Sequence, residues 1–371
     1  VWEHFSENDD RARSTKQLCT RDNGPSVVDG PAGPQVPNII NANFLSQGCA
    51  PGPLYGPTAF QTPSAGAIPF VVALESYGAY IPNGLNPYAG LNQSQDLRTI
   101  DSIIDPKYRA KNDTIELNAD YNITPTLTLT SQTGFNKDSL YSTEDYNRFN
   151  TTTGLFSTDT GFNKYFIGTD GEFCDPQLGC SSRLVGEDLS QERAQQFSQE
   201  VRLASNFSGP LNFSVGANYL HYQTVEDYYV FINAISLLTE YLNQFYGGTF
   251  ADPTLPHAPF DAALANSCKP QPATLNTVLT FTGFGCSWID PNSVDSLDGQ
   301  GHNYFRSQNP YRLNSWAGFG EVYYQVTSDL KLTGGLRWTD DMKHFTEIPS
   351  WTAMAGKGYP VESISNPLQG Y

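Results

Sequence analysis

Hydrophobic and polar residues alternate along three stretches of the chain, and each stretch is interrupted by a short turn. In the first, apolar residues from Ile115 to Tyr121 alternate with polar ones, the chain turns at Asn122–Pro125, and Leu127 and Leu129 follow among threonines. This period places successive side chains on opposite faces of a β-strand, so one face is apolar and the other polar. The pattern predicts three hairpins, over residues 113–138, 190–229 and 314–346.

The second and third hairpins repeat this plan around turns at Ser208-Gly209-Pro210 and Thr327-Ser328-Asp329. Each strand runs for about ten residues or more, the length that crosses a bilayer when a strand is tilted, whereas strands of soluble proteins average about half of that. The alternation assigns one set of residues to a lipid-facing surface: Ile115, Leu117, Leu203, Phe213, Val215 and Leu332.

The connections between the hairpins are very unequal. Residues 1–16 are predicted to form a strand, residues 17–112, 139–189 and 230–313 form long turn-rich loops, and residues 347–371 begin a further loop. All the long loops lie on the same side of the hairpins, and compact soluble domains rarely contain even one such connection. Tight turns on one rim and long loops on the other are typical of outer-membrane β-barrels.

Composition supports this interpretation and excludes others. Charged residues make up only 16% of the chain, and the net charge of -17 opposes binding to a nucleic-acid backbone. No apolar run approaches the roughly 20 residues of a membrane-spanning helix, since the nearest, Ala67–Leu74, is short and contains Pro69. Any membrane span must therefore consist of strands.

These observations predict an all-β fold, an antiparallel transmembrane β-barrel portion with about seven long strands. Bacterial barrels have even strand numbers, and an open sheet edge is not stable in lipid, so we expect the chain to be part of a larger polypeptide. A soluble, secreted β-sandwich is the alternative from another class. Glycosylation triplets would accompany it, and they occur at Asn92, Asn112, Asn122, Asn150, Asn206 and Asn212.

Six cysteines lie in pairs within the predicted loops. Neighbour spacing and an even count favour three local disulfides, Cys19 with Cys49, Cys174 with Cys180, and Cys268 with Cys286. Because six cysteines allow 15 pairings, the sequence alone does not fix the connectivity. Six free thiols are the alternative, and a zinc site is disfavoured because the chain has no CxxC spacing.

Catalytic signatures are absent from the sequence, which predicts that the chain is not an enzyme. It contains no GxSxG, HExxH, Walker or GxGxxG motif, and its five histidines are scattered. No cofactor is expected, although the Asp-containing loops at Gly168–Asp175 and Asp290–Asp298 offer oxygen ligands of the kind that calcium prefers.

Aromatic residues provide two further expectations. Those near strand ends, namely Tyr121, Phe207, Phe213 and Trp338, are candidates for interfacial girdles, in which rings meet lipid and polar tips meet water. Flat rings in the loops stack on planar or sugar ligands, and this gives six candidate ligand-binding residues: Tyr228, Tyr229, Tyr241, Phe245, Tyr246 and Trp288.

Two stretches resemble one family of barrels. Phe197–Asn218 reads FSQEVRLASNFSGPLNFSVGAN, and Trp316–Phe345 reads WAGFGEVYYQVTSDLKLTGGLRWTDDMKHF. Their Glu-x-Arg-Leu strand, short turn and Gly-Leu-Arg-aromatic-Thr-Asp strand resemble barrel hairpins of TonB-dependent receptors. The cysteine of Lys16–Asp22, KQLCTRD, lies where such receptors often carry a loop cysteine.

The resemblance implies a middle portion of a barrel of about 22 strands that encloses a plug in the outer membrane of a Gram-negative bacterium. It implies energy-coupled import of a scarce nutrient, such as a siderophore, a vitamin or an oligosaccharide-like ligand. The implied partners are outer-membrane lipid and lipopolysaccharide, the nutrient itself, and TonB through a missing N-terminal region. A passive porin or an adhesive surface barrel without a plug is the alternative function.

Overall fold

Long antiparallel strands dominate the computed structural model of the chain. It describes residues 1–21, 27–30, 33–37, 49–62, 90–146, 148–151, 153–156, 167–237, 294, 305–346 and 348–352. The described elements form an all-β fold, and among these residues no helix is both long enough and apolar enough to cross a membrane.

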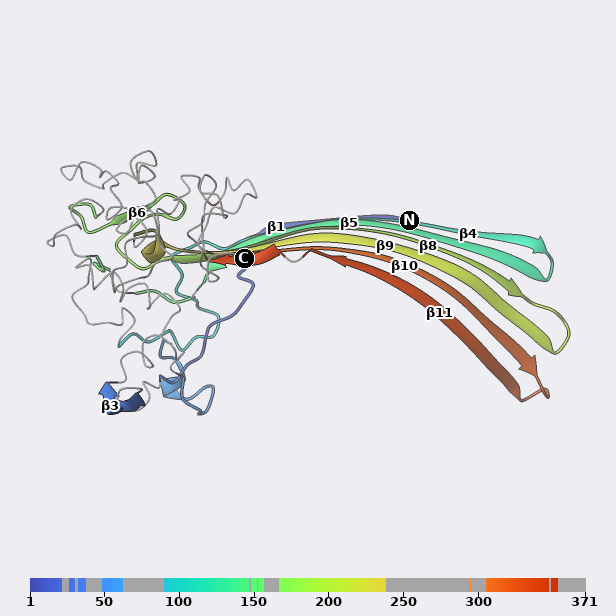
Figure 1. The fold of residues 1–371 in the computed structure, drawn as a ribbon, viewed down its shortest axis with the longest axis horizontal. Helices are drawn as coiled ribbons and strands as arrows, with labels where there is room; N and C mark the ends of the chain where they lie inside the picture. The colour runs from blue at the N-terminus through green and yellow to red at the C-terminus, as the bar shows by residue number, and fades with distance from the viewer. Residues whose placement is uncertain are drawn as a thin grey trace.

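Seven strands form one continuous antiparallel sheet in the order β1-β4-β5-β8-β9-β10-β11 (Figure 1). These strands lie side by side in the same order as they occur along the chain, so the sheet is a meander. The short strand β12 pairs with β10 outside this path. The bounds are β1 Trp2–Asp9, β4 Lys107–Thr124, β5 Leu127–Asp145, β8 Gly186–Ser205, β9 Leu211–Ile232, β10 Phe305–Gln325, β11 Lys331–Phe345 and β12 Ile348–Thr352.

The connections between the strands differ sharply at the two ends of the sheet. Figure 1 shows the tight turns β4-β5, β8-β9 and β10-β11 gathered at one end of a long, curved sheet, the turn end, while the strand ends that lead into the long connections lie at the other, the loop end. Short elements occur within these connections: β2 Val27–Gly30, β3 Gly33–Pro37, the 3-10 helix η2 Pro57–Ala59, β6 Phe173–Asp175 and β7 Gly179–Ser181.

The strands are longer than the alternation predicts, except for β1 and β11. The first two hairpins run over 107–145 and 186–232, beyond the predicted limits on both strands. The third runs over 305–345, which extends its first strand but ends within the predicted limit of its second. On β4 and β5 both faces are polar around Asp113 and Lys137, so the ladder of backbone hydrogen bonds continues there after the hydrophobic alternation has stopped. The predicted strand over residues 1–16 ends instead at Asp9, and residues 10–16 run on as irregular backbone.

The two faces of the sheet differ in polarity near the turn end. Strand pairing places Tyr121, Leu129, Leu203, Val215 and Leu336 in rows on one face, the apolar face. The six residues predicted to share a face all lie on it. The opposite polar face carries hydrophilic residues in matching rows, including Asp120, Thr130, Arg202 and Arg337.

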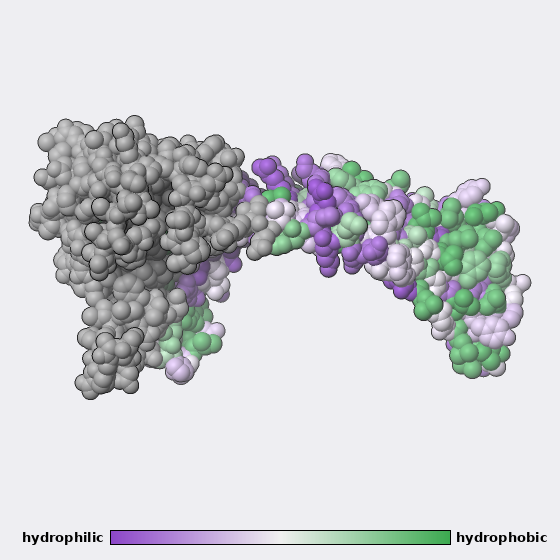
Figure 2. All heavy atoms as spheres, viewed as in Figure 1, coloured by the Kyte–Doolittle hydropathy of each residue, from purple (hydrophilic) through white to green (hydrophobic). Residues whose placement is uncertain are grey.

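Among the described residues, no second layer covers either face in this region. Leu336 is 87% exposed, Trp338 66% and Leu117 65%, although residues of these types are normally buried. Figure 2 shows hydrophobic residues concentrated toward the turn end of the strands and hydrophilic residues along their middle. The apolar face of the turn end is therefore a large exposed hydrophobic surface, which we call the apolar band.

Buried residues lie instead at the loop end. The largest fully buried side chains there come from β8, β9 and the connections that pack over them: Tyr229, Phe173, Phe231, Leu155, Leu189 and Leu237. The loop end is thus packed around buried side chains, whereas the strands toward the turn end have one apolar and one polar face, with exposed side chains on the apolar face.

Candidate functional site at the loop end

Two pairs of adjacent carboxylates meet where β5 and β8 reach the loop end. Glu144 lies directly opposite Asp188, and Asp145 lies opposite Glu187. Like charges facing each other across a sheet are destabilising unless cations or donors compensate them. The surrounding segments supply both.

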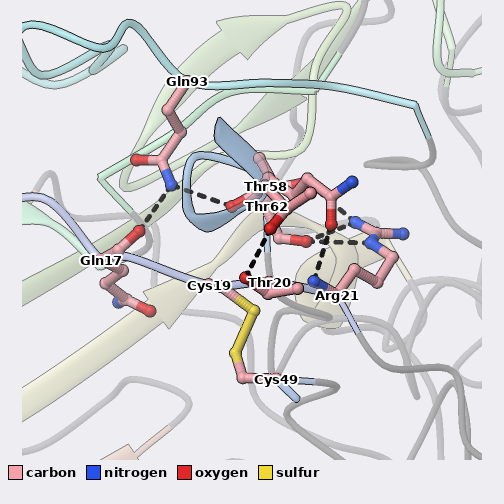
Figure 3. Close-up of a disulfide and its surroundings, with 9 residues drawn as sticks. Gln17, Cys19, Thr20, Arg21, Cys49, Thr58, Thr62 and Gln93 are labelled. Carbon is pink, nitrogen blue, oxygen red and sulfur yellow. Dashed lines mark hydrogen bonds between the residues drawn. A yellow bond between two sulfur atoms is a disulfide. The ribbon is translucent and has the colours of Figure 1, made fainter. Parts of the chain in front are cut away.

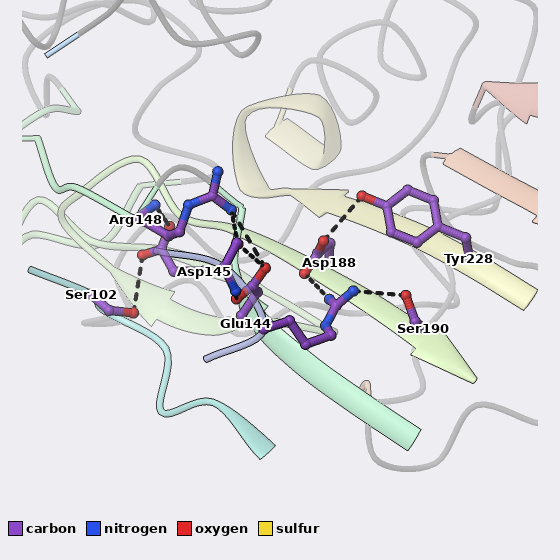
Figure 4. A network of polar contacts seen from close by, with 9 residues as sticks. Ser102, Glu144, Asp145, Arg148, Asp188, Ser190 and Tyr228 are labelled. Atoms are coloured by element: carbon purple, nitrogen blue, oxygen red, sulfur yellow. Dashed lines mark hydrogen bonds and ion pairs between the residues drawn. The ribbon is translucent and has the colours of Figure 1, made fainter. Parts of the chain in front are cut away.

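Arg13 compensates Asp188 from the segment that follows β1. Its Nη2 atom lies 2.5 Å from Asp188 Oδ1, and its Nη1 atom donates to Ser190 Oγ at 2.9 Å (Figure 4). Tyr228 of β9 donates its hydroxyl to Asp188 Oδ2 at 3.1 Å. These contacts bind the N-terminal segment to the polar face of β8 and β9.

Ser14 and Arg148 compensate Glu144 in the same way. Ser14 donates to Glu144 from its backbone N at 3.1 Å and from its hydroxyl at 2.6 Å. Arg148 Nη1 donates to Ser14 Oγ at 2.7 Å and lies 3.4 Å from Glu144 Oε1. One carboxylate therefore joins the N-terminal segment to the connection after β5.

Asp145 extends the network to the segment before β4. It accepts hydrogen bonds from the backbone N of Arg148 at 3.0 Å and of Ile103 at 3.2 Å. We call the group of Arg13, Ser14, Glu144, Asp145, Arg148, Asp188 and Tyr228 the loop-end network. It holds both ends of the β1–β4 connection and the start of the β5–β8 connection against one rim of the sheet.

Burial sets the protonation of this network. It raises the pKa of Asp188 from 3.8 to about 6, and Glu144 adds to that rise, whereas Arg13 opposes it. Burial also raises the pKa of the Tyr228 hydroxyl, helped by the neighbouring Asp188 carboxylate. With a pKa of about 6, Asp188 changes its charge close to neutral pH.

A second cluster folds the connection between β1 and β4 around a disulfide. Cys19 is bonded to Cys49, closing a ring over a sequence separation of 30 (Figure 3). Beside it, the Arg21 guanidinium donates to the Thr62 carbonyl at 2.6 Å and to its hydroxyl at 2.8 Å. Gln93 donates to the carbonyls of Gln17 at 2.5 Å and Gln61 at 3.2 Å. Four short segments thereby meet at one point.

Lys16 connects this disulfide cluster to the segment that leads into β4. Its ammonium group donates to the carbonyl of Ser94 at 2.5 Å and to that of Asp96 at 3.0 Å. Burial lowers the pKa of Lys16, while Asp96 and Asp101 act in the opposite direction. The ammonium group of Lys16 thus uses its donors to hold two backbone carbonyls of the segment that leads into β4.

The predicted ligand-binding aromatics are only partly within the described residues. Tyr228 and Tyr229 lie in strand β9 and not in a loop, because the ladder extends to Ile232. Tyr229 is fully buried, and the Tyr228 hydroxyl donates a hydrogen bond to Asp188. The remaining four lie outside the described residues: Tyr241, Phe245, Tyr246 and Trp288.

Two of the three predicted cysteine pairs are bonded in the structure. Besides Cys19–Cys49, Cys174 is bonded to Cys180 across the small β6-β7 hairpin. Cys268 and Cys286 lie outside the described residues. The two observed bonds brace separate connections at the loop end.

The two Asp-containing loops whose oxygen atoms could serve as calcium ligands are described to different extents. In Gly168–Asp175, the Asp175 carboxylate accepts backbone hydrogen bonds from Gln177 at 2.7 Å and Leu178 at 2.9 Å, and one from the Ser236 hydroxyl. It therefore shapes the β6-β7 turn. Of Asp290–Asp298 only residue 294 is described, and within the described part of the chain no group of three or more His, Cys, Asp or Glu could hold a metal.

Sequence reasoning missed the loop-end network, because its contacts join residues as many as 177 positions apart and follow no short motif. One signal was available. The acidic doublets Glu144-Asp145 and Glu187-Asp188 lie at corresponding ends of consecutive strands, and an antiparallel register brings them together. Such an arrangement requires cations from elsewhere in the chain.

Two comparisons with known proteins find no relative of the chain. No protein-family model matches the chain, and a search of curated proteins finds no match. The geometry of the sheet and its loops therefore carries the functional argument.

Proposed function

We propose that this chain forms part of the wall and the extracellular loops of an outer-membrane β-barrel, and that the barrel is a TonB-dependent receptor that imports a scarce nutrient. The apolar band carries this proposal. A soluble β-sandwich buries one face of each sheet against another sheet. Here no described part of the chain covers the apolar face, and Leu336 and Trp338 are largely exposed. Lipid is the environment that suits it.

The height of the apolar band fits a bilayer. It extends on β11 from Leu332, opposite Tyr324, to Met342, opposite Asn314. About ten residue steps of roughly 3.3 Å give ~33 Å along the strand. A strand tilt of about 35–45° reduces this to ~25 Å across the membrane, the height of the outward apolar surface of known barrels.

Aromatic side chains mark the two edges of the band. Toward the loop end, Tyr219 packs against Trp316 with ring centroids 4.3 Å apart, and the Tyr219 hydroxyl donates to Asn314 at 3.2 Å, one row farther from the band centre. The same edge includes Trp2, Phe135 and Phe197. A ring in the band and a hydroxyl directed outward are what a lipid-water interface favours.

The turn-end edge has its own aromatic residues. Phe207 and Phe213 lie with ring centroids 6.1 Å apart, and Tyr121 and Tyr324 occupy neighbouring rows. Trp338, predicted for a girdle, instead lies opposite Gly318 in the middle of the band. The aromatic residues named here thus lie in the three rows nearest the turn end and the two rows nearest the loop end, with Trp338 in the row between them. Enrichment of aromatic residues toward both edges is typical of the girdles of outer-membrane barrels.

The edges of the sheet also suit a larger barrel. Among the described residues, β1 and β11 each pair along one side only. Open edges leave backbone groups unsatisfied in lipid, so a membrane-inserted sheet must be closed by further strands. A barrel of about 22 strands, as the hairpin resemblance implies, would enclose a lumen wide enough for a plug.

Recognition belongs to the loop end in this proposal. Loops braced by Cys19–Cys49, Cys174–Cys180 and the loop-end network would face the cell exterior, where ligands arrive. Ordered loops bind ligands at a smaller entropic cost than mobile ones. The ligand class follows only from the resemblance to TonB-dependent receptors: a siderophore, a vitamin or an oligosaccharide-like compound.

The test begins with the intact protein in its own cells. We expect it in the outer-membrane fraction, with a gel mobility that changes on boiling, as folded barrels show. A strain that lacks the gene should lose growth on one of a panel of limiting ferric siderophores, cobalamin or oligosaccharides, and loss of TonB should have the same effect. Recovery in the soluble fraction would contradict the barrel. Open-pore conductance in a planar bilayer, with uptake independent of TonB, would support a passive porin instead.

A further inference from the structure

The segment that follows β1 crosses the polar face of the sheet at the loop end. Its Arg11 guanidinium lies over the ring of Tyr108 on β4, 4.7 Å from the centroid. The next residues contact Glu144 on β5 and Asp188 on β8, and strand pairing places all three of these sheet residues on the polar face. We call residues 10–16 the strap, because they run from β1 over β4 and β5 to β8.

One side chain of the sheet lies under the strap without a hydrogen-bond partner. Ser142 is on the polar face between two contact points, two positions before Glu144 and directly opposite Ser190, to which Arg13 donates. It is fully buried, and its hydroxyl has no partner among the described residues. The Nε atoms of Arg13 and Arg148 are buried and unpartnered in the same part of the chain. Three polar groups thus stay unsatisfied while the strap is in place, and each raises the energy of that arrangement.

The backbone and the charges beside the strap raise this energy further. Arg148, which donates to Ser14 from the connection after β5, has a φ angle of 60°, in the left-handed region that residues other than glycine rarely adopt. Glu144 and Asp188 face each other directly, so two carboxylates share one covered place (Figure 4). The closed position of the strap therefore combines strong contacts with strain, which makes a second, open position accessible.

The charge of Asp188 decides between the two positions. Four charged or titratable groups face it from the elements around it: Arg13 of the strap, Glu144 of β5, Arg148 of the following connection and Tyr228 of β9. Burial raises its pKa to about 6, and Arg13, which opposes that rise, is the smaller influence. Release of the strap removes both the cover and Arg13, so it returns this pKa toward its ordinary value. An ionised Asp188 therefore favours release of the strap, and a protonated one favours closure.

We propose that the strap is an acid-closed gate at the mouth of the barrel, which lies across the inner wall in acid and leaves it as the pH rises toward neutral. This inference rests on the proposed function, because that function identifies the polar face as the lumen and the loop end as the mouth. Lys16, the last residue of the strap, holds the carbonyls of Ser94 and Asp96. The strap therefore carries part of the β1–β4 connection with it, and its departure widens the mouth.

The experiment measures how often the place under the strap becomes accessible. The intact protein, purified in detergent, carries Ser142→Cys, and the reaction of residue 142 with a maleimide is followed by peptide mass spectrometry. The matched control is Ser198→Cys, a partly exposed position on the polar face of β8 outside the strap. The ratio of the two rates removes the intrinsic pH dependence of thiol reactivity. Heat-modifiable mobility verifies that each variant is folded.

We expect this ratio to rise about ten-fold from pH 5 to pH 7, the factor that follows from a pKa of about 6 in the closed position and 3.8 in the open one. Asp188→Asn should keep the ratio low and constant over this range. Asp138→Asn, which removes a carboxylate from the polar face of β5 outside the strap, should leave the ten-fold rise intact. Arg13→Gln/Ser14→Ala removes both contacts of the strap and should give a high ratio at both pH values.

Hydrogen exchange of the unmodified protein tests the gate without a substitution under the strap. The Ser14 amide donates to Glu144, so its protection factor should fall from pH 5 to pH 7 while that of the β4-β5 hairpin stays constant. A rise in the labelling ratio that persists in Asp188→Asn, a ratio that does not change with pH, or constant protection of the Ser14 amide would overturn the inference.

The outcomes for the gate and for the proposed function are separate. A protein in the outer membrane that shows any of these contrary results keeps the proposed function and loses only the gate. Recovery in the soluble fraction would instead defeat the proposed function, and with it the gate, even if the strap still opened.

Discussion

The ring of Phe319 covers Gly216 on the polar face of the sheet, where the two residues lie directly opposite each other on β10 and β9. A Cβ atom at Gly216 would lie 2.5 Å from Cζ of that ring and 2.7 Å from the carbonyl oxygen of Val201. Arg337 lies over the other side of the contact, with its guanidinium 5.7 Å from the ring centroid. Glycine at this position is therefore a requirement of packing, since the ring occupies the space of a side chain.

We predict that Gly216→Ala destabilises the folded protein by about 1 to 3 kcal/mol, the usual cost of overpacking. Gly318→Ala is the matched control, because a Cβ there meets nothing within 4 Å. Urea unfolding in detergent measures both. In a Phe319→Ala background the cost at Gly216 should fall but not vanish, because the Val201 carbonyl remains. Equal effects at Gly216 and Gly318 would show that the ring does not lie where the structure has it.

The two faces of β9 predict opposite responses to a charge. Val215 lies in the apolar band, 44% exposed, and its neighbour Ser214 lies on the polar face opposite Glu321. In a lipid-inserted sheet, Val215→Arg should cost about 2 to 4 kcal/mol near the bilayer midplane, whereas Ser214→Arg should be tolerated by an aqueous lumen. Refolding into lipid vesicles measures the difference. Equal costs at the two positions would contradict the assignment of the faces.

Hydrophobic alternation was sufficient to predict the strand order and faces, and insufficient to predict the strand ends. From Ile115 to Tyr121 one face is apolar, so the period is visible in the sequence. At Asp113, opposite Lys137, both faces are polar and the signal stops, although pairing continues to Lys107. Hydrophobic and polar residues alternate only where the two faces of the sheet lie in different environments, so the pattern stops where both faces are polar.

The loop end could not be derived by the same means. Arg13 and Asp188 are 175 positions apart, and each lies in a segment without regular periodicity. Ion pairs of this kind depend on where a loop returns to the sheet, which the local sequence does not determine. The cysteines were more informative, because Cys19 and Cys49 are constrained to partners within bonding distance.

The Cys19–Cys49 bond should stabilise its connection without supporting the sheet. The chain-entropy relation gives roughly 3 to 4 kcal/mol for a closed ring of about 30 residues. We expect Cys19→Ala/Cys49→Ala to increase proteolytic cleavage within residues 49–62 while heat-modifiable mobility persists. Cys174→Ala/Cys180→Ala, which opens a ring of only about six residues, should have a smaller effect of roughly 2 kcal/mol on its own loop. Loss of the folded sheet in either variant would contradict this division.

Non-reducing peptide mapping extends this prediction to the third pair. We expect a peptide that links Cys268 to Cys286, because local partners can bond without crossing the sheet. Free thiols at these positions, or a bond from either of them to a different loop, would refute the pairing. The two bonds seen in the structure provide internal standards for the same digest.

The last prediction concerns the pH dependence that Asp188 gives to the loop end. Because burial raises its pKa from 3.8 to about 6, the folded protein favours the protonated carboxyl more than the unfolded chain does. A group of this kind contributes stability that is fully present below pH 4 and is lost as the pH rises through 6. The shift of about two pKa units corresponds to roughly 3 kcal/mol.

Asp188→Asn isolates this contribution, since asparagine does not titrate. The unfolding free energy of the unmodified protein, measured by urea titration in detergent, should rise relative to that of the variant as the pH falls from 7 to 4, by up to roughly 3 kcal/mol. Arg13→Gln removes the cation that holds the Asp188 pKa down, so the midpoint of this change should move to higher pH. The double variant Arg13→Gln/Asp188→Asn should show neither effect. A stability difference between the unmodified protein and Asp188→Asn that stays constant from pH 4 to 7 would mean that Asp188 is not buried against Arg13 and Tyr228 in the folded protein.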